Sequence, residues 1–294
     1  MTGPLGARSL VVVTGKGGVG KSTLAAAIGH GLAARGRRTL VLETDPRESL
    51  HQLLDTPPSD GAVVKVRGGL WLQNVQPRNE IEALVRRRIP VPLVARVVGA
   101  SPVFHHFVEG APGLKELAVL GHALRLALGE TGPGVETVVL DAPATGHGVS
   151  LLAAPRLVTE VLGAGPVAEL AGEVAELVRD PGRSGLVVVT VAEEMAVQES
   201  LELRAELADR VDRAPDALVV NQLLPPFDRR ARGPEEARAL WRDRRAVQEV
   251  ELARLAAEWA GPRLEVPLLA TPPGPALVEQ CAAVLDPWLA GGGV

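Results

Sequence analysis

The sequence is poor in cysteine and in aromatic residues, and both shortages exclude classes of function. Cys281 is the one cysteine among 294 residues, so the chain has no intrachain disulfide and no Cys-x-x-Cys redox or metal motif. Aromatic residues make up 2% of the chain and tyrosine is absent, which argues against a surface that stacks the bases of single-stranded nucleic acid. No apolar run approaches the roughly 18 residues that a membrane-spanning helix needs.

The sequence also lacks an excess of positive charge. The formal net charge is −4, whereas nucleic-acid binding usually needs a concentrated basic face. The densest basic runs, at 86–88 and 229–232, are typical of solvated helix faces, although an anion or an acidic partner could also bind there. The first residues carry no basic region followed by an apolar stretch and a cleavage site. We therefore expect a cytoplasmic protein without nucleic-acid binding or stable membrane insertion.

Short β-branched runs alternate with longer helical patterns, which is typical of βαβ units and a parallel sheet. The runs are continuously apolar, as in strands that are covered on both faces. The third and fourth runs in chain order could form a hairpin or two edge strands. The predicted strands are Ser9–Thr14, Thr39–Glu43, Gly61–Val66, Leu70–Val75, Thr137–Leu140, Gly185–Val191, Ala217–Val220 and Leu264–Leu269.

Two regions, about 79–129 and 223–260, show mainly helical patterns. Predicted strands continue to residue 269, beyond both regions, so we interpret the regions as helical insertions rather than as separate domains. The sequence therefore predicts one domain over residues 1–294. Its class is α/β, with a mostly parallel central sheet of about seven or eight strands flanked by helices.

A glycine-rich loop between the first predicted strand and a helix at about Lys21–Arg35 has the pattern of a phosphate-binding loop. Residues 15–22 match G-x-x-x-x-G-K-S/T in the strand-to-helix context that the motif requires. Such a loop points backbone N–H groups at phosphate oxygens, and the helix N-terminus adds a favourable dipole. Lys21 should reach the β- and γ-phosphates, Ser22 should ligate Mg²⁺ and Thr23 should touch the α-phosphate. The amides that cradle the phosphates would come from Gly17, Gly18, Val19 and Gly20.

Lys16 is a second lysine inside this loop, and a generic phosphate loop does not need it. A flexible ammonium there can point out of its own site towards a nucleotide held by a facing subunit, as an arginine finger does. The stretch 16–23, K-G-G-V-G-K-S-T, resembles the deviant phosphate loop of the MinD, ParA and ArsA class of dimeric ATPases. The resemblance implies a P-loop NTPase fold, hydrolysis of ATP with Mg²⁺, and a catalytic role for Lys16 across a dimer interface.

Two further segments resemble the switches of the ArsA and Get-pathway branch of that class. Residues 44–50, T-D-P-R-E-S-L, resemble the first switch, D-P-A-H-S-L, which implies that Asp45 orients the attacking water close to the metal. Residues 141–147, D-A-P-A-T-G-H, resemble the second switch, D-T-A-P-T-G-H, which implies that Asp141 reaches Mg²⁺ through water. Considered alone, Asp45 could equally be a helix N-cap. Arg47, Glu48 and residues 142–144 depart from the family pattern, which leaves the coupling of the switches to a partner open.

The resemblance also implies an adenine pocket near the end of the chain. Asn221 corresponds to the family asparagine that reads adenine, because an amide can bond to both the donor and the acceptor edge of that base. An ordinary turn asparagine is the alternative interpretation. Pro267 and the loop that follows it would close the pocket.

The resemblance does not identify a partner or cargo. Arsenite-pump ATPases bind metalloids through cysteine thiolates, and eukaryotic Get-pathway ATPases dimerise on a Cys-x-x-Cys zinc site. This sequence has a single cysteine and no Cys-x-x-Cys motif, so we expect no metalloid or zinc site. We expect a homodimer or a paralogous heterodimer in which hydrolysis at the interface switches the binding of a partner or cargo. The alternative is a nucleotide-gated targeting module for a membrane or tail-anchored client, with little intrinsic turnover. The apolar segment Ile89–Val98 could form a client groove, although such stripes are more often core.

Overall fold

Eight strands form one central sheet in the part of the chain that the computed structural model describes, which is residues 5–88, 111–144, 146–228 and 232–291. The strand order is β3-β4-β2-β5-β1-β6-β7-β8. Neighbouring strands are parallel except for the antiparallel pair β3–β4 at one edge. The strands are β1 (Leu10–Gly15), β2 (Thr39–Glu43), β3 (Val64–Arg67), β4 (Leu70–Asn74), β5 (Thr137–Ala144), β6 (Ser184–Val191), β7 (Ala217–Leu223) and β8 (Arg263–Pro267).

The central strands are apolar on both faces because helices cover both faces. In β1, Leu10 and Val12 pack into one hydrophobic cluster while Val11 and Val13 pack into the other, and all four side chains are fully buried. Successive side chains of a strand point to opposite faces. A continuous apolar run is therefore what a strand at the centre of a two-sided core requires.

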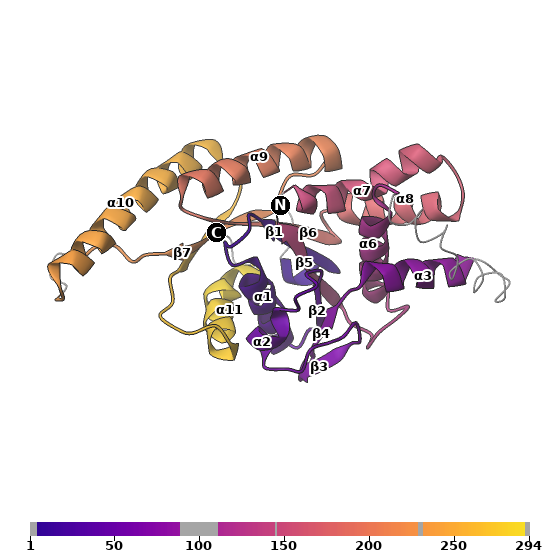
Figure 1. The fold of residues 1–294 in the computed structure, drawn as a ribbon, viewed down its shortest axis with the longest axis horizontal. Coiled ribbons are helices and arrows are strands. Elements are labelled where there is room, and N and C mark those ends of the chain that lie inside the picture. The colour runs from indigo at the N-terminus through magenta and orange to yellow at the C-terminus, as the bar shows by residue number, and fades with distance from the viewer. Residues whose placement is uncertain (1–4, 89–110, 145, 229–231, 292–294) are drawn as a thin grey trace.

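The helices are divided between the two faces of the sheet (Figure 1). One face is covered by η1 (Leu5–Ala7), α1 (Lys21–Ala34), α2 (Leu50–Leu54) and α11 (Pro275–Leu289). The other face is covered by α3 (Pro77–Arg88), α6 (Leu114–Ala127), α7 (His147–Leu162), α8 (Pro166–Arg179), α9 (Glu194–Val211) and α10 (Glu235–Glu258). Helix α10 packs on the fold through Leu255 near its C-terminal end, and its other end extends away from the sheet (Figure 1).

The predicted class, an α/β fold with a mostly parallel sheet flanked by helices, is confirmed. The third and fourth strands form the predicted hairpin, but only β3 is an edge strand, because β4 also pairs with β2. The predicted end of the fifth strand at Leu140 is wrong. Strand β5 continues to Ala144 because its backbone still pairs with β1, where Ala144 lies opposite Gly15. Asp141 is therefore inside a strand rather than after one.

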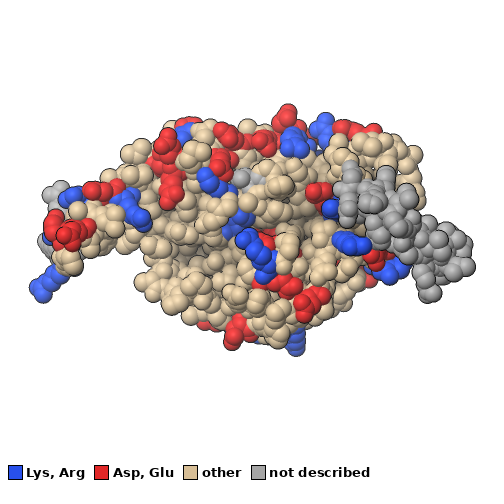
Figure 2. Space-filling model, viewed as in Figure 1, with Lys and Arg blue, Asp and Glu red and all other residues tan. Residues whose placement is uncertain are grey.

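The structure describes parts of both predicted helical regions. In the first, α3 and α6 are described, whereas the apolar segment Ile89–Val98 lies outside the described residues. The second region starts with the last residue of β7, and its helix begins only at Glu235. Within the described ranges, no helix combines the length and the apolar character needed to cross a bilayer. Over the face shown in Figure 2, acidic and basic side chains are intermixed rather than gathered by sign.

Candidate functional site

The phosphate loop lies at the C-terminal edge of the sheet, at a point where the order of the strands reverses. Strand β1 lies between β5 and β6, and the chain goes from β1 through α1 to β2, on the β5 side. The later strands β6, β7 and β8 extend the sheet on the other side. In open α/β sheets, a crevice that binds ligands forms at such a reversal.

Two glycines give the loop its shape. Gly15 has a φ of 147°, and a Cβ there would lie 2.1 Å from the carbonyl oxygen of Val189 on β6. Gly20 has a φ of 92° and immediately precedes α1. A Cβ on Gly20 would lie 2.4 Å from Nδ2 of Asn221. Only glycine combines these backbone angles with so little space. Gly17 and Gly18, in contrast, are exposed.

The two loop lysines have different surroundings. Lys21, the first residue of α1, donates from Nζ to the carbonyl oxygen of Lys16 at 2.9 Å. Burial lowers the pKa of the Lys21 ammonium, and the nearby carboxylates of Asp141 and Asp45 partly oppose this shift. The Lys16 side chain is partly exposed, and its Nζ lies 2.7 Å from Oε1 of Glu199 on α9.

Asp141 places a buried carboxylate beside the first turn of α1. The residue is 5% exposed, it pairs with Val13 of β1 and Glu43 of β2 in the sheet register, and its side chain accepts a hydrogen bond from the Ser22 hydroxyl. Burial raises the pKa of the Asp141 carboxyl to about 7, although Ser22 and Lys21 both favour the ionised form. Its Oδ1 atom is buried without a hydrogen-bond partner among the described residues.

Asp45 follows β2 and forms a close pair with Arg47. Arg47 donates to Asp45 from Nε at 3.1 Å, from Nη2 at 2.8 Å and from its backbone nitrogen at 2.9 Å. These hydrogen bonds hold the pKa of the Asp45 carboxyl below its usual value. Because β2, β5 and β1 are neighbours in the sheet, Asp45, Asp141 and the phosphate loop lie at the same edge.

Asn221 lies inside β7, where it is the register partner of Val191 on β6, and it supports the phosphate loop. Its Nδ2 atom donates to the carbonyl oxygen of Val19 at 2.9 Å, and the residue is buried. The amide nitrogen is therefore already used by the loop in this structure. The interpretation as a turn asparagine is wrong, because the residue is in a strand, and the reading of adenine stays a prediction. Pro267 is the last residue of β8, next to β7 in the sheet.

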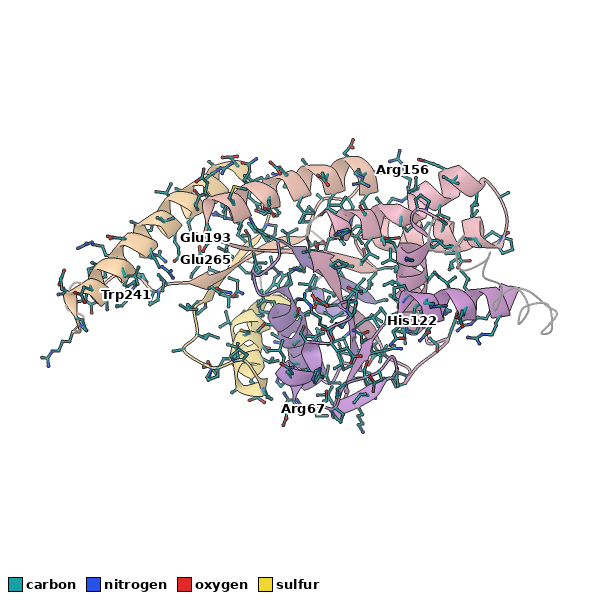
Figure 3. All side chains as sticks on the ribbon, viewed as in Figure 1. Arg67, His122, Arg156, Glu193, Trp241 and Glu265 are labelled. Carbon is teal, nitrogen blue, oxygen red and sulfur yellow. The ribbon has the colours of Figure 1, made fainter. Side chains whose placement is uncertain are left out.

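A cavity of about 450 Å³ opens beside the loop, between the ends of β6 and β7 and helix α10. Sequence reasoning missed the contribution of α10, because nothing in the helix marks its inner face. Trp241 of α10 (Figure 3) donates from Nε1 to the carbonyl oxygen of Pro225 at 3.0 Å. Gln248 accepts from the backbone nitrogen of Leu224 at 2.9 Å, so the helix is attached to the segment after β7. The residues that line the cavity include Lys16, Val19, Glu193, Gln222, Arg244 and Val247.

The residues at the sheet edge fit a magnesium-bound triphosphate. Mg²⁺ prefers oxygen ligands and is usually held by one or two protein groups together with substrate phosphates. The hydroxyl of Ser22 and the unpartnered Oδ1 of Asp141 are such groups. Thr23 is half-buried in the same turn of α1, where a phosphate oxygen could accept from it. Within the described ranges, no group of three or more His, Cys, Asp or Glu side chains is arranged so that it could hold a metal ion by itself.

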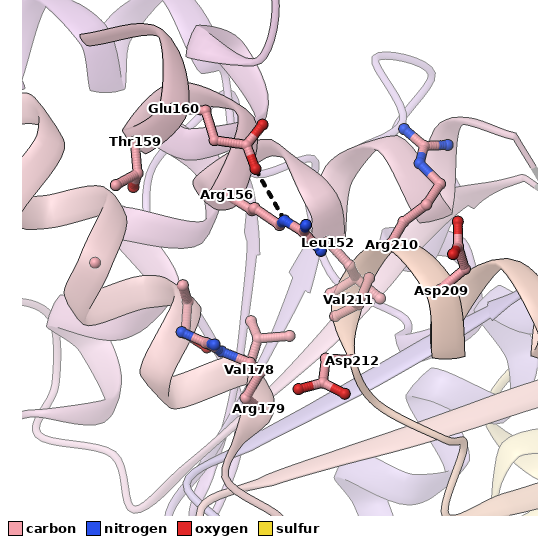
Figure 4. A pocket seen from close by; sticks show the side chains of 12 residues that line it. Leu152, Arg156, Thr159, Glu160, Val178, Arg179, Asp209, Arg210, Val211 and Asp212 are labelled. Atoms are coloured by element: carbon pink, nitrogen blue, oxygen red, sulfur yellow. Dashed lines mark hydrogen bonds and ion pairs between the residues drawn. The ribbon is translucent and has the colours of Figure 1, made fainter. Parts of the chain in front are cut away.

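A second cavity, of about 360 Å³, lies between α7, α8 and α9 (Figure 4). Leu152 and Val178 are buried at its floor. Its charged rim balances three arginines, Arg156, Arg179 and Arg210, against three acids, Glu160, Asp209 and Asp212. The rim is charge-neutral and lacks a glycine loop, so this cavity does not resemble a phosphate site.

The sequence is similar to known ATPases over most of its length. Residues 8–171 match the family model of the anion-transporting ATPases. ATPase BagA of Mycobacterium tuberculosis is 31% identical over 228 residues, which cover 74% of this chain and 65% of that protein. ATPase GET3B of Arabidopsis thaliana is 26% identical over 269 residues, which cover 74% of this chain and 65% of that protein. ATPase ARSA1 of Chlamydomonas reinhardtii is 24% identical over 278 residues, which cover 74% of this chain and 36% of that protein. The chain thus spans less than two thirds of the length of these relatives.

Proposed function

The chain belongs to the family of anion-transporting ATPases, and from this we propose that it binds Mg-ATP beside the phosphate loop and hydrolyses it to ADP and phosphate. The observation that supports the proposal most strongly is the placement of Lys21 and Ser22 against the buried carboxylate of Asp141. A lysine, a hydroxyl and an acid meet there although the acid is more than a hundred residues away along the chain.

Each group has a distinct task in the proposed reaction. The amides of residues 17–20 and the start of α1 hold the phosphate oxygens, and Lys21 offsets negative charge on the β- and γ-phosphates. Bound Mg²⁺ would neutralise further phosphate charge from its place beside Ser22 and Asp141. Asp45 orients a water molecule for in-line attack on the γ-phosphorus, and the bond from that phosphorus to the bridging oxygen of ADP breaks.

The direct test measures phosphate release and nucleotide binding separately. Purified protein should release phosphate from ATP only with Mg²⁺, and Lys21→Ala should remove this activity. Calorimetry should show binding of Mg-ADP to the wild type and a large loss of affinity in Asp141→Asn. Folded wild-type protein that gives no heat of binding with Mg-ATP or Mg-ADP would refute the proposal.

We propose further that the working unit is a homodimer or a dimer with a paralogous chain, with the nucleotide at the interface. Two features support this. Lys16 lines the cavity and its side chain is partly exposed, and Met195, in the first turn of α9, is 61% exposed beside the same edge. Light scattering coupled to size exclusion should show the dimer with a non-hydrolysable ATP analogue, and a monomer under that condition would count against it.

Hydrogen bonds from two neighbouring residues of β4 support the proposal that hydrolysis switches the conformation of a partner-binding region. Asn74 donates from Nδ2 to the carbonyl oxygen of Asp45 at 2.6 Å. Oε1 of the preceding residue, Gln73, accepts from Nε2 of His122 on α6 at 2.9 Å. His122 in turn contacts Glu80 of α3 at 3.0 Å. A movement of the segment after β2 would therefore reach the helices that flank residues 89–110, which lie outside the described residues.

A nucleotide-gated binding module with little turnover of its own is the second candidate. The pairing of Asp45 with Arg47 favours it, because hydrogen bonds from Arg47 to both carboxylate oxygens leave Asp45 less able to orient a water molecule. Brisk hydrolysis by the purified protein without any partner would exclude this candidate. Hydrolysis that starts only when a cell fraction supplies a partner would support it.

A further inference from the structure

Both carboxylate oxygens of Asp45 are occupied by the neighbouring Arg47. Nε and the backbone nitrogen of Arg47 donate to Oδ1, at 3.1 and 2.9 Å, and Nη2 donates to Oδ2 at 2.8 Å. This is the two-pronged geometry in which a planar guanidinium matches a carboxylate. A carboxylate has about four sites that accept hydrogen bonds, so three of the four are already used.

The backbone around this pair is held in place, whereas the Arg47 side chain is not buried. Asn74 donates to the carbonyl oxygen of Asp45 at 2.6 Å, and the backbone nitrogen of Glu48 donates to the same oxygen at 3.1 Å. Glu48 accepts from the backbone nitrogen of Ser59 at 2.7 Å. The Arg47 side chain is 88% exposed. The main chain of the segment can therefore stay where it is while Arg47 moves away from Asp45.

We propose that Arg47 is a positioning residue that holds Asp45 in a resting orientation, and that its side chain must leave before Asp45 can orient the attacking water. The inference rests on the proposed function, in which Asp45 serves that water. Arg47 stands where the resembled switch pattern has alanine, so the restraint is a property of this chain rather than of the motif. Release exchanges two guanidinium hydrogen bonds for bonds to water, without any covalent change.

The restraint is weak because the pair is exposed to solvent. Exposed ion pairs contribute little to stability, and salt screens them. Removing the Arg47 side chain should therefore raise turnover by only about two- to fivefold. The backbone nitrogen of residue 47 still donates to Oδ1 after truncation, so the loop keeps its turn.

The test compares Arg47→Ala and Arg47→Lys with the wild type, at saturating Mg-ATP and from low to high ionic strength. We expect kcat of Arg47→Ala to exceed that of the wild type by about two- to fivefold at low salt, with Arg47→Lys intermediate because an ammonium cannot form the fork. The wild-type rate should rise towards that of Arg47→Ala as salt screens the pair, while the KM for ATP stays the same. Arg156→Ala is the matched control, because Arg156 is also exposed and pairs with Glu160 at 3.0 Å away from the loop.

A second measurement does not depend on turnover. A double-mutant cycle of Arg47→Ala with Asp45→Asn, on the unfolding of nucleotide-free protein, should show a coupling of about two- to fivefold in the unfolding equilibrium constant. The inference would be overturned by a kcat of Arg47→Ala that is lower than or equal to that of the wild type, or by the absence of coupling. If Mg-ADP still binds in that case, the proposed nucleotide site is still supported. Failure of the wild type and of Arg47→Ala to bind Mg-ADP would instead refute the proposed function, and this inference with it.

Discussion

The ammonium nitrogen of Lys16 lies 2.7 Å from a carboxylate oxygen of Glu199 on α9, within the same chain. The side chains are 32% and 27% exposed, so the pair is partly open to solvent and breaks at low cost. A lysine that acts on a facing nucleotide would exchange this carboxylate for phosphate oxygens. The ion pair is therefore a resting arrangement, and it is compatible with action of Lys16 across a subunit interface.

Replacing Lys16 should slow the turnover of ATP but leave the affinity for nucleotide nearly unchanged. If Lys16 acts on the nucleotide of a facing subunit, Lys16→Ala should slow phosphate release by about 100-fold or more and leave the affinity for Mg-ADP within a few-fold in calorimetry. Lys65→Ala, which removes an exposed lysine from the edge strand β3, is the control and should behave as the wild type does. Normal turnover by Lys16→Ala would remove the cross-subunit role.

Replacing either of two loop glycines by alanine should lower the free energy of unfolding, but by different amounts. Gly18 and Gly20 both have positive φ, 84° and 92°, so alanine strains the backbone at each. A Cβ on Gly18 meets nothing within 4 Å, whereas a Cβ on Gly20 meets Asn221 at 2.4 Å. Gly20→Ala should therefore lower the free energy of unfolding by about 1–3 kcal/mol more than Gly18→Ala. Urea denaturation without nucleotide measures this, and equal losses would show that the Asn221 contact relaxes freely.

Asp141 should contribute stability to the nucleotide-free protein that is lost as the pH rises from about 4 to about 7. Asp141 has a pKa of about 7 in the fold against 3.8 as its ordinary value. Between these values the folded state holds a proton that the unfolded state has released, so rising pH favours unfolding, by up to about 4 kcal/mol. Denaturant titrations at several pH values, without Mg²⁺, measure the slope.

The Asp141→Asn variant isolates this contribution, because it removes the titrating group and should flatten the pH dependence. Asp286→Asn is the control, because Asp286 is an exposed partner of Arg35, and it should leave the slope in place. An unchanged slope in Asp141→Asn would assign the pH dependence to other groups.

Helix α10 should contribute to nucleotide affinity. Arg244 lines the cavity beside the phosphate loop, so Arg244→Ala should raise the Kd for Mg-ADP by roughly three- to tenfold, as expected for the loss of one hydrogen bond. Arg242→Ala is the matched control, because Arg242 lies two residues away on the same helix and pairs with Asp243 at 3.1 Å. Equal affinities of the two variants in calorimetry would place Arg244 outside the nucleotide site.

Much of the sheet could be predicted because its strands depend on local composition. The second strand, Thr39–Glu43, was predicted with the bounds that the structure shows, and the first helix differs by one residue at its end. The ends of β5 and β7 could not be predicted, because Asp141 and Asn221 are polar residues that continue a strand only through pairing with neighbours. The partner-binding region stays a prediction, since Ile89–Val98 lies outside the described residues.

The sequence by itself determined the phosphate loop, because a run of glycines followed by lysine and serine specifies its backbone turn and its chemistry within nine residues. The pairing of Arg47 with Asp45 also needs only neighbouring residues. The tertiary structure alone decided that Asn221 supports Val19, that Lys16 meets Glu199, and that Arg244 lines the cavity. These contacts join residues far apart in the chain, and their distances follow from the order of the strands and from how the helices pack on the sheet, which no short sequence pattern encodes.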